Sequence, residues 1–78
     1  MDREELEEYY KTVELDQFHA HEALDRTFLV SEMFDGYVLD HPFIFKNEKL
    51  MKEAEEISFA MFNLYQNISN ESLDKYDH

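Results

Sequence analysis

The chain has 78 residues and no cysteine, a length that suits one small domain and a composition that excludes disulfides and zinc–thiolate sites. Nineteen acidic residues against seven lysines and arginines give a net charge of −12, which disfavours direct binding to nucleic acid or to an anionic membrane. There is no apolar leader and no run of about 18 apolar residues, so we expect a cytoplasmic protein.

The first predicted element is an acidic N-terminal arm over residues 1–15, which we expect to be helical. Its opening residues include three acids, which suit a helix N-terminus because the unpaired N–H groups there favour negative charge. Helical spacing continues from the arm into the next segment, so one long helix is compatible with the sequence. Thr12 and Asp16 are both suitable N-caps, so a break near residues 12–16 is compatible as well.

The second predicted element is a helix over about residues 16–40. One face of it carries side chains at alternating steps of four and three, which is a helical period. Continued from the arm, that series is Leu6, Tyr10, Val13, Gln17, Ala20, Leu24, Thr27, Ser31, Phe34 and Val38. The polar members Gln17, Thr27 and Ser31 either fix the register of a helix bundle through hydrogen bonds or line a small-ligand pocket.

From residue 28 to residue 39 this helix is apolar around most of its circumference, which indicates burial on more than one side. We therefore predict a homo-oligomer, specifically a dimer. Its predicted interface residues are Phe28, Val30, Met33, Phe34 and Tyr37. Gly36 costs about 1 kcal/mol relative to alanine in a helix, and is predicted to mark a close approach between helices.

His41 and Pro42 end this helix, because proline disfavours helical backbone in the residue before it. The apolar residues 43–45 are expected to form a loop that caps the end of the core. Asn47 is the expected N-cap of a second helix over about residues 48–68. The inward-facing series of that helix is predicted to be Leu50, Ala54, Ile57, Met61, Leu64 and Ile68.

Residues 69–78 are polar and without periodicity, so we expect a disordered tail. The sequence thus predicts an all-α fold, in which an antiparallel helical hairpin over residues 16–68 carries an extra N-terminal helical arm. Two such hairpins would form a four-helix bundle.

The stretch HAHEALDRT at residues 19–27 holds the densest set of chemically versatile side chains. His21 and Asp25 are one helical turn apart, and Arg26 is placed to reach a carboxylate on the second helix. Together with Thr27 they are the predicted ligand-binding residues. The alternative is that the stretch is one solvated flank of a packed helix.

A metal site would need further ligands. The spacing Asp16-x-x-His19, with Glu53 or Glu56 opposite, is the nearest match to a carboxylate-bridged di-metal bundle, but Asp16 and His19 lie beside the inward-facing series. We therefore predict no metal and no cofactor. Catalysis is not expected either, because the chain lacks cysteine and has a single glycine, too few for a phosphate-binding loop.

The arm is a candidate protein-binding surface, because its tyrosines are favoured at interfaces and its acids would attract a basic protein. The predicted members of this surface are Glu4, Glu5, Glu7, Glu8, Tyr9, Tyr10 and Glu14.

Residues 21–42, HEALDRTFLVSEMFDGYVLDHP, and residues 64–69, LYQNIS, resemble small uncharacterised acidic helical proteins of tailed phages and prophages. The shared features are a Leu-Asp-Arg-Thr core, an Asp-His-Pro turn and an ending close to Leu-Tyr-Gln. The resemblance carries no catalytic residues over to this chain. It implies a phage context, in which small acidic proteins often disable host enzymes or defence systems.

Besides a purely structural role as a subunit or scaffold piece, two functions remain open from the sequence. In the first, the chain is an interaction protein whose acidic helical surface binds and inhibits a host or phage protein with a basic surface, such as a defence or nucleic-acid-binding protein. In the second, the oligomer binds or sequesters a small ligand, a nucleotide or a metal between hairpins, with Arg26 as a phosphate contact.

Overall fold

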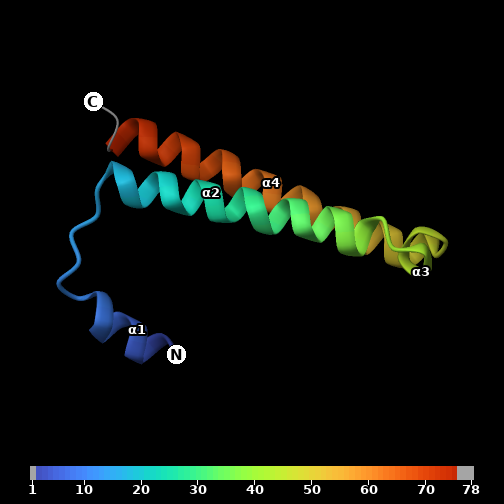
Figure 1. The fold of residues 1–78 in the computed structure, drawn as a ribbon, viewed down its shortest axis with the longest axis horizontal. Coiled ribbons are helices and arrows are strands. Elements are labelled where there is room, and N and C mark those ends of the chain that lie inside the picture. Colours follow the sequence, from blue (N-terminus) through green and yellow to red (C-terminus); the bar gives the residue numbers. More distant parts are fainter. Residues whose placement is uncertain (1, 76–78) are drawn as a thin grey trace.

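The computed structural model describes the backbone of residues 2–75 and the side chains of residues 2–71 (Figure 1). The elements in chain order are α1 (Arg3–Tyr10), α2 (Gln17–Phe34), the π-helical segment η1 (Asp35–Leu39), α3 (Pro42–Phe45) and α4 (Glu48–Lys75). The described residues contain no strand, so the all-helical prediction is confirmed. No helix among them has the length and apolar composition needed to cross a bilayer.

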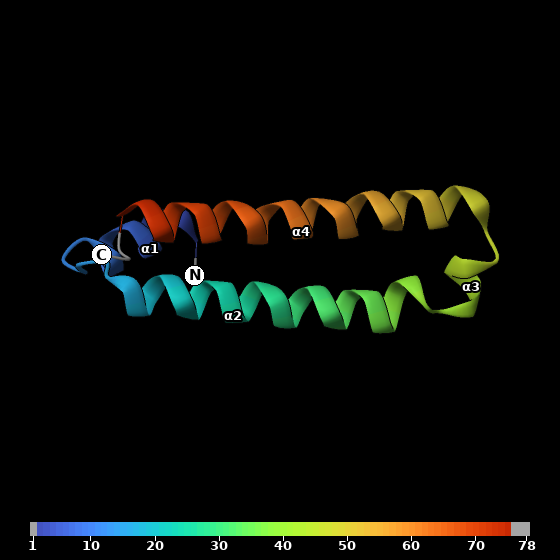
Figure 2. The ribbon, with the colours of Figure 1, turned by 90° about the horizontal axis from the view of Figure 1, so that it is seen from above.

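Helices α2 and α4 lie side by side along most of their length and run in opposite directions (Figures 1 and 2). The short helix α3 connects them at one end, so the start of α2 lies beside the end of α4. We refer to α2 and α4 together as the helix pair. Helix α1 packs against none of the other described helices, and hangs to one side of the pair (Figure 1).

Side-chain caps fix where the helices begin. The Asp16 carboxylate accepts a hydrogen bond from the backbone N–H of His19 at 3.0 Å, and Asp16 itself has extended backbone. The chain therefore breaks between Tyr10 and α2, and one continuous helix through the arm is not formed. The predicted cap of the second helix is also present, because the Asn47 side chain accepts from the N–H of Leu50 at 3.1 Å.

The inward face of α2 matches the predicted series. Its half-buried side chains include Gln17, Ala20, Leu24, Thr27, Ser31 and Phe34, and Val38 continues the series in η1. On α4 four of the six predicted inward residues, Leu50, Ala54, Met61 and Ile68, are buried or half-buried, and the other two are not. Ile57 and Leu64 remain 51% and 52% exposed, whereas their neighbours Ser58 and Tyr65 are half-buried. Ser58 Oγ donates a part-buried hydrogen bond to Asp35 Oδ1 at 2.7 Å, which fits its inward position.

The helix pair is one layer thick and encloses little. Among the described residues only Ala54 is a buried hydrophobic side chain, at 5% exposure. A chain of this length normally buries more than half of its unfolded surface. In the single chain, by contrast, most large apolar side chains of the pair are exposed to solvent.

The connection between the helices differs from expectation in several details. The last turn of the first helix is π-helical, with the Asp40 N–H donating to the carbonyl of Asp35 at 3.1 Å. A Cβ built on Gly36 would meet nothing within 4 Å, so the predicted close approach is absent within this chain. Residues 43–45 form helix α3 rather than a loop, and Phe43 and Phe45 are 69% and 67% exposed, so these rings do not cap the core.

Helix α4 continues to Lys75, past the end expected at Ile68. The residues expected to form a disordered tail are therefore helical as far as Lys75, and residues 76–78 lie outside the described part of the chain. The extension has a simple cause, because residues 69–75 contain neither glycine nor proline to end a helix.

Candidate functional site

The acidic surface of the arm is exposed to solvent. All seven of its predicted members are exposed, six of them on α1 and Glu14 in the non-helical linker that follows. The rings of Tyr9 and Tyr10 meet edge to face at 5.1 Å, and Arg3 pairs with Glu7 at 3.3 Å. Because α1 packs against no other described helix, neither tyrosine is covered by the helix pair.

A cavity of about 660 Å³ lies between the arm and the start of α2. Its walls combine aromatic rings, apolar side chains and one guanidinium group. The lining residues are Tyr9, Tyr10, Val13, Leu15, His19, Glu22 and Arg26.

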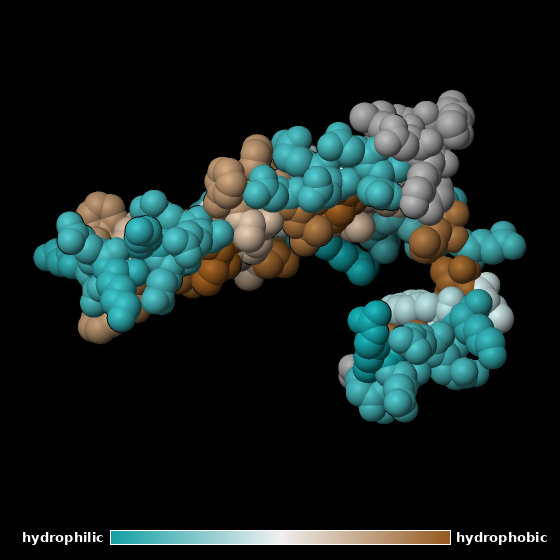
Figure 3. Space-filling model, turned by 180° about the vertical axis from the view of Figure 1, so that it is seen from behind, coloured by the Kyte–Doolittle hydropathy of each residue, from teal (hydrophilic) through white to brown (hydrophobic). Residues whose placement is uncertain are grey.

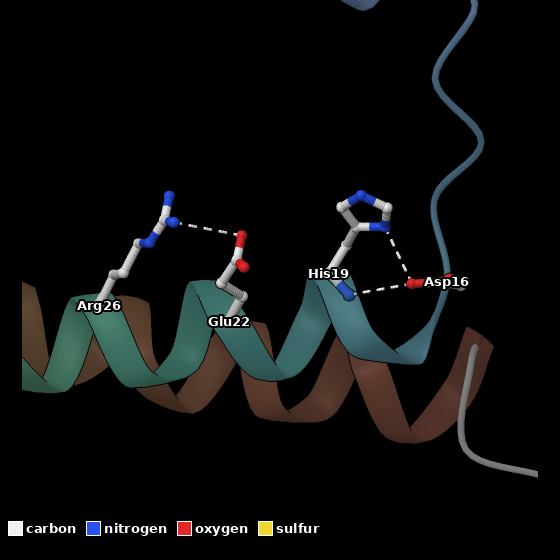
Figure 4. A network of polar contacts seen from close by, with 4 residues as sticks. All are labelled: Asp16, His19, Glu22 and Arg26. Carbon is white, nitrogen blue, oxygen red and sulfur yellow. Dashed lines mark hydrogen bonds and ion pairs between the residues drawn. The ribbon is translucent and has the colours of Figure 1, made fainter.

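The first turns of α2 carry a row of polar contacts on one side of the helix (Figure 4). His19 Nδ1 lies 2.9 Å from Asp16 Oδ1, the same oxygen that accepts the backbone N–H of His19. That backbone hydrogen bond, together with the His19 side chain, holds the pKa of Asp16 below its ordinary value. One turn further on, Arg26 pairs with Glu22 at 3.4 Å. Arg26 thus pairs with a carboxylate of its own helix, and not with the predicted one on α4.

The structure does not bring the four predicted ligand-binding residues together. His21 and Asp25 are exposed, and no hydrogen bond or ion pair joins them within the described residues. The Thr27 hydroxyl donates to the carbonyl of Ala23 at 2.7 Å, so it is used within α2. Arg26 and Thr27 line a shared cavity to which neither His21 nor Asp25 contributes. Most of this stretch is a solvated flank of the helix, as in the alternative interpretation.

The antiparallel arrangement also separates the residues of the considered metal site. Glu53 and Glu56 lie in the first turns of α4, beside the end of α2, whereas Asp16 and His19 lie at its start (Figure 2). No group of three or more metal-ligating side chains occurs among the described residues.

Two grooves follow the helix pair, and they differ in chemistry. The first, which we call the neutral groove, combines two adjoining cavities of about 380 and 250 Å³ that share Leu64. Its walls are Leu15, Ala20, Ala23, Thr27, Val30, Met61, Leu64 and Ile68, with Arg26 and Asn67 at the edge and Asp16, His19 and Glu71 only at one end. The second, the acidic groove, has a volume of about 310 Å³ and is lined by Ser31, Asp35, Leu39, Glu55, Ser58, Phe59 and Phe62.

The predicted oligomer-interface residues do not form one surface. Phe34 is half-buried inside the helix pair. Phe28 and Val30 are 52% and 56% exposed, but they lie two residues apart and therefore about 200° apart around the helix. The Phe28 ring lies 6.1 Å from that of Tyr65, while Val30 lines the neutral groove. The predicted interface residues thus lie on more than one side of the helix, as the apolar circumference of residues 28–39 indicates.

No protein-family model, curated protein or solved structure matches this chain. The function is therefore inferred from the fold and from the chemistry of the protein's surfaces.

Proposed function

We propose that this chain is a small phage-type interaction protein, which self-associates through its helix pair and inhibits a host protein through the acidic arm. The observation that supports this proposal most directly is the state of α1. The helix is acidic and solvent-exposed, carries two exposed tyrosines and packs against none of the other described helices. A helix with no role in the fold of its own chain is suited to recognise another molecule.

The charge of the arm defines the partner. The first 16 residues hold seven acids and two bases, so a basic surface would attract them over several ångströms and raise the association rate. Tyr9 and Tyr10 then supply the aromatic contact area that protein interfaces favour. The partner is thus a host protein with a basic site, of the kind that binds nucleic acid or acts in defence, in the host cytoplasm.

Affinity capture from bacterial lysate, followed by titration of the captured protein in purified form, tests this proposal. The variant is Glu4→Lys/Glu5→Lys/Glu8→Lys, which reverses the arm without touching the Arg3–Glu7 pair. We expect at least about tenfold weaker binding of the purified partner, and a wild-type affinity that falls as salt rises.

The matched control is Glu48→Lys/Glu53→Lys/Glu56→Lys, which makes the same change of net charge at exposed positions of α4. It should bind like the wild type, and His21→Ala should as well. Binding that survives both arm reversal and high salt contradicts the proposal. Equal loss in the arm variant and the control would mean that only net charge matters, and would also contradict it.

A second function is favoured by the cavity between the arm and α2. The rings of Tyr9 and Tyr10 and the Arg26 guanidinium line the same space, a combination that suits a flat aromatic group carrying a phosphate. In this alternative the oligomer sequesters a nucleotide or similar small ligand, although Glu22 at the same wall and the net charge oppose an anion.

Native mass spectrometry of the purified protein separates the two functions. A retained small molecule that disappears on denaturation, and that Arg26→Ala removes while the oligomer persists, would support sequestration. An oligomer without extra mass, and without a melting-temperature shift on adding nucleotides or divalent metals, would contradict it.

A further inference from the structure

The two grooves of the helix pair lie on opposite faces. Leu64 lines the neutral groove and Phe62 the acidic groove, and two residues of separation place them about 200° apart around α4. Figure 3 shows the surface: the most strongly hydrophobic side chains run along the side of the pair where the arm hangs, while the other side mixes hydrophilic side chains with a few less strongly hydrophobic ones. The two faces of the helix pair therefore differ in chemistry.

Charge decides which face another copy of this chain can use. Each copy carries a net charge of −12, so two copies repel each other at a distance. Contact through the acidic groove would bring Asp35 and Glu55 of one copy toward the same carboxylates of the other. Along the neutral groove, from Ala20 to Val30, the lining contains no carboxylate at all. As far as the residues of the helix pair are concerned, self-association is therefore least opposed on the neutral side.

The size and shape of that face also fit. Val30 and Leu64 are 56% and 52% exposed, while Ala20 and Ala23 leave room for a neighbouring helix. The 18 residues of α2 span about 27 Å, and two adjacent helices are about 20 Å wide. The projected area of such a face is roughly 540 Å², which is of the same order as the roughly 800 Å² per partner of a typical stable protein interface.

We propose that a second copy of this chain covers the neutral groove, related to the first by a two-fold axis, so that two helix pairs form a four-helix bundle. The interface is isologous, with Ala23, Val30 and Leu64 of both copies near its centre. The acidic groove then remains on the outside, where its carboxylates and the rings of Phe59 and Phe62 face solvent. This assembly deepens the self-association part of the proposed function and does not depend on the partner.

Single cysteines test the proposal, because the natural chain has none and each introduced thiol is the only one present. Ala23→Cys lies in the neutral groove, and Gln66→Cys lies one turn beyond Phe62 on the acidic side. Both positions are exposed in the single chain. We expect Ala23→Cys to react with a charged maleimide at least about tenfold more slowly than Gln66→Cys, and the two rates to become equal in urea.

Native mass spectrometry and the variant Ala23→Glu complete the test. The wild type should have the mass of two chains or an even multiple, and Ala23→Glu should shift it toward the single chain, whereas Gln66→Glu should not. Circular dichroism checks that both variants stay helical. A monomeric wild type, equal labelling rates, or a slower rate at Gln66→Cys overturns the proposal. Arm reversal alters neither site, so failure of partner binding would leave these results unchanged.

Discussion

At the scale of single residues, two side chains set the beginning of the long helices. Asp16 and Asn47 both accept a backbone N–H three residues ahead, and each follows a stretch that is not part of a long helix. Asn47→Ala should lower the free energy of unfolding by about 1 kcal/mol, because it leaves the N–H of Leu50 without its cap. Urea denaturation followed by circular dichroism measures this loss, and Asn47→Asp is the control that keeps the cap. Equal stability of Asn47→Ala and the wild type would mean that the cap is dispensable.

Asp16 makes the same kind of cap pH-dependent. Its pKa is lowered in the folded chain, so its stabilising effect is fully present above the ordinary carboxyl value of 3.8 and is lost as pH falls through the lowered value. We expect Asp16→Ala to melt below the wild type at neutral pH, and the gap between them to close in acid. A gap that persists at the lowest pH would show that the stabilising effect of Asp16 does not depend on the ionisation of its carboxyl group.

Substitution of Gly36, in contrast, is expected to raise the stability of the protein. Its φ is not positive and a Cβ there would touch nothing, so alanine fits without strain. Gly36→Ala should stabilise the protein by about 0.5–1 kcal/mol, which corresponds to a few degrees in melting temperature for a domain of this size. A thermal melt monitored at 222 nm provides the measurement. A lower melting temperature would indicate that another chain approaches Gly36 in the assembly.

At the scale of elements, the contact between α4 and η1 is the clearest polar link across the pair. Ser58→Ala removes the half-buried hydrogen bond to Asp35 and should cost about 1 kcal/mol. Ser31→Ala is the matched control, since Ser31 lines the same groove on the facing helix. The two variants are compared by urea denaturation. If they lose the same stability, the bond to Asp35 is not what holds this end of the pair.

The contact between Ser58 and Asp35 also shows which part of the fold could not be predicted from the sequence. The helices, their caps and the inward face of α2 follow from local rules, because spacing and capping chemistry are visible in the chain itself. The inward face of α4 follows from them only in part. Ile57 and Ser58, like Leu64 and Tyr65, are adjacent pairs in which either member can face inward, and the choice depends on which part of α2 lies opposite. That pairing is a tertiary contact, which local sequence patterns do not reveal. The hydrogen bond between Ser58 and Asp35 is one part of it.

The candidate site was harder to predict for a related reason. The exposure of the arm surface was predictable, because so many acidic side chains close together cannot be buried. The four predicted ligand-binding residues around His21 are not brought together in the single chain, because Arg26 and Thr27 line a cavity that His21 and Asp25 do not reach. The two grooves are built from residues of both α2 and α4, and no local pattern announces a surface shared between two helices.

At the scale of the whole molecule, the arm and the helix pair are separable. The linker after Tyr10 is non-helical and includes Lys11, whereas Arg26, Lys49 and Lys52 lie within the helices of the pair. Brief trypsin treatment should therefore cut after Lys11 first and leave a stable fragment that contains α2 and α4. Intact-mass measurement over time identifies the cut. Cleavage at Arg26 as early as at Lys11 would mean that the pair itself opens readily.

The separate arm has a further consequence once two chains assemble. Each assembled particle would present two acidic helices on short tethers, and a partner with two basic sites would be held at both. After the first arm binds, the second searches only the small volume its linker allows, at an effective concentration in the millimolar range for a short flexible tether. Arms that are individually weak would then release such a partner slowly. A six-residue break in the helix, between Tyr10 and Gln17, would thus convert modest affinity into long residence.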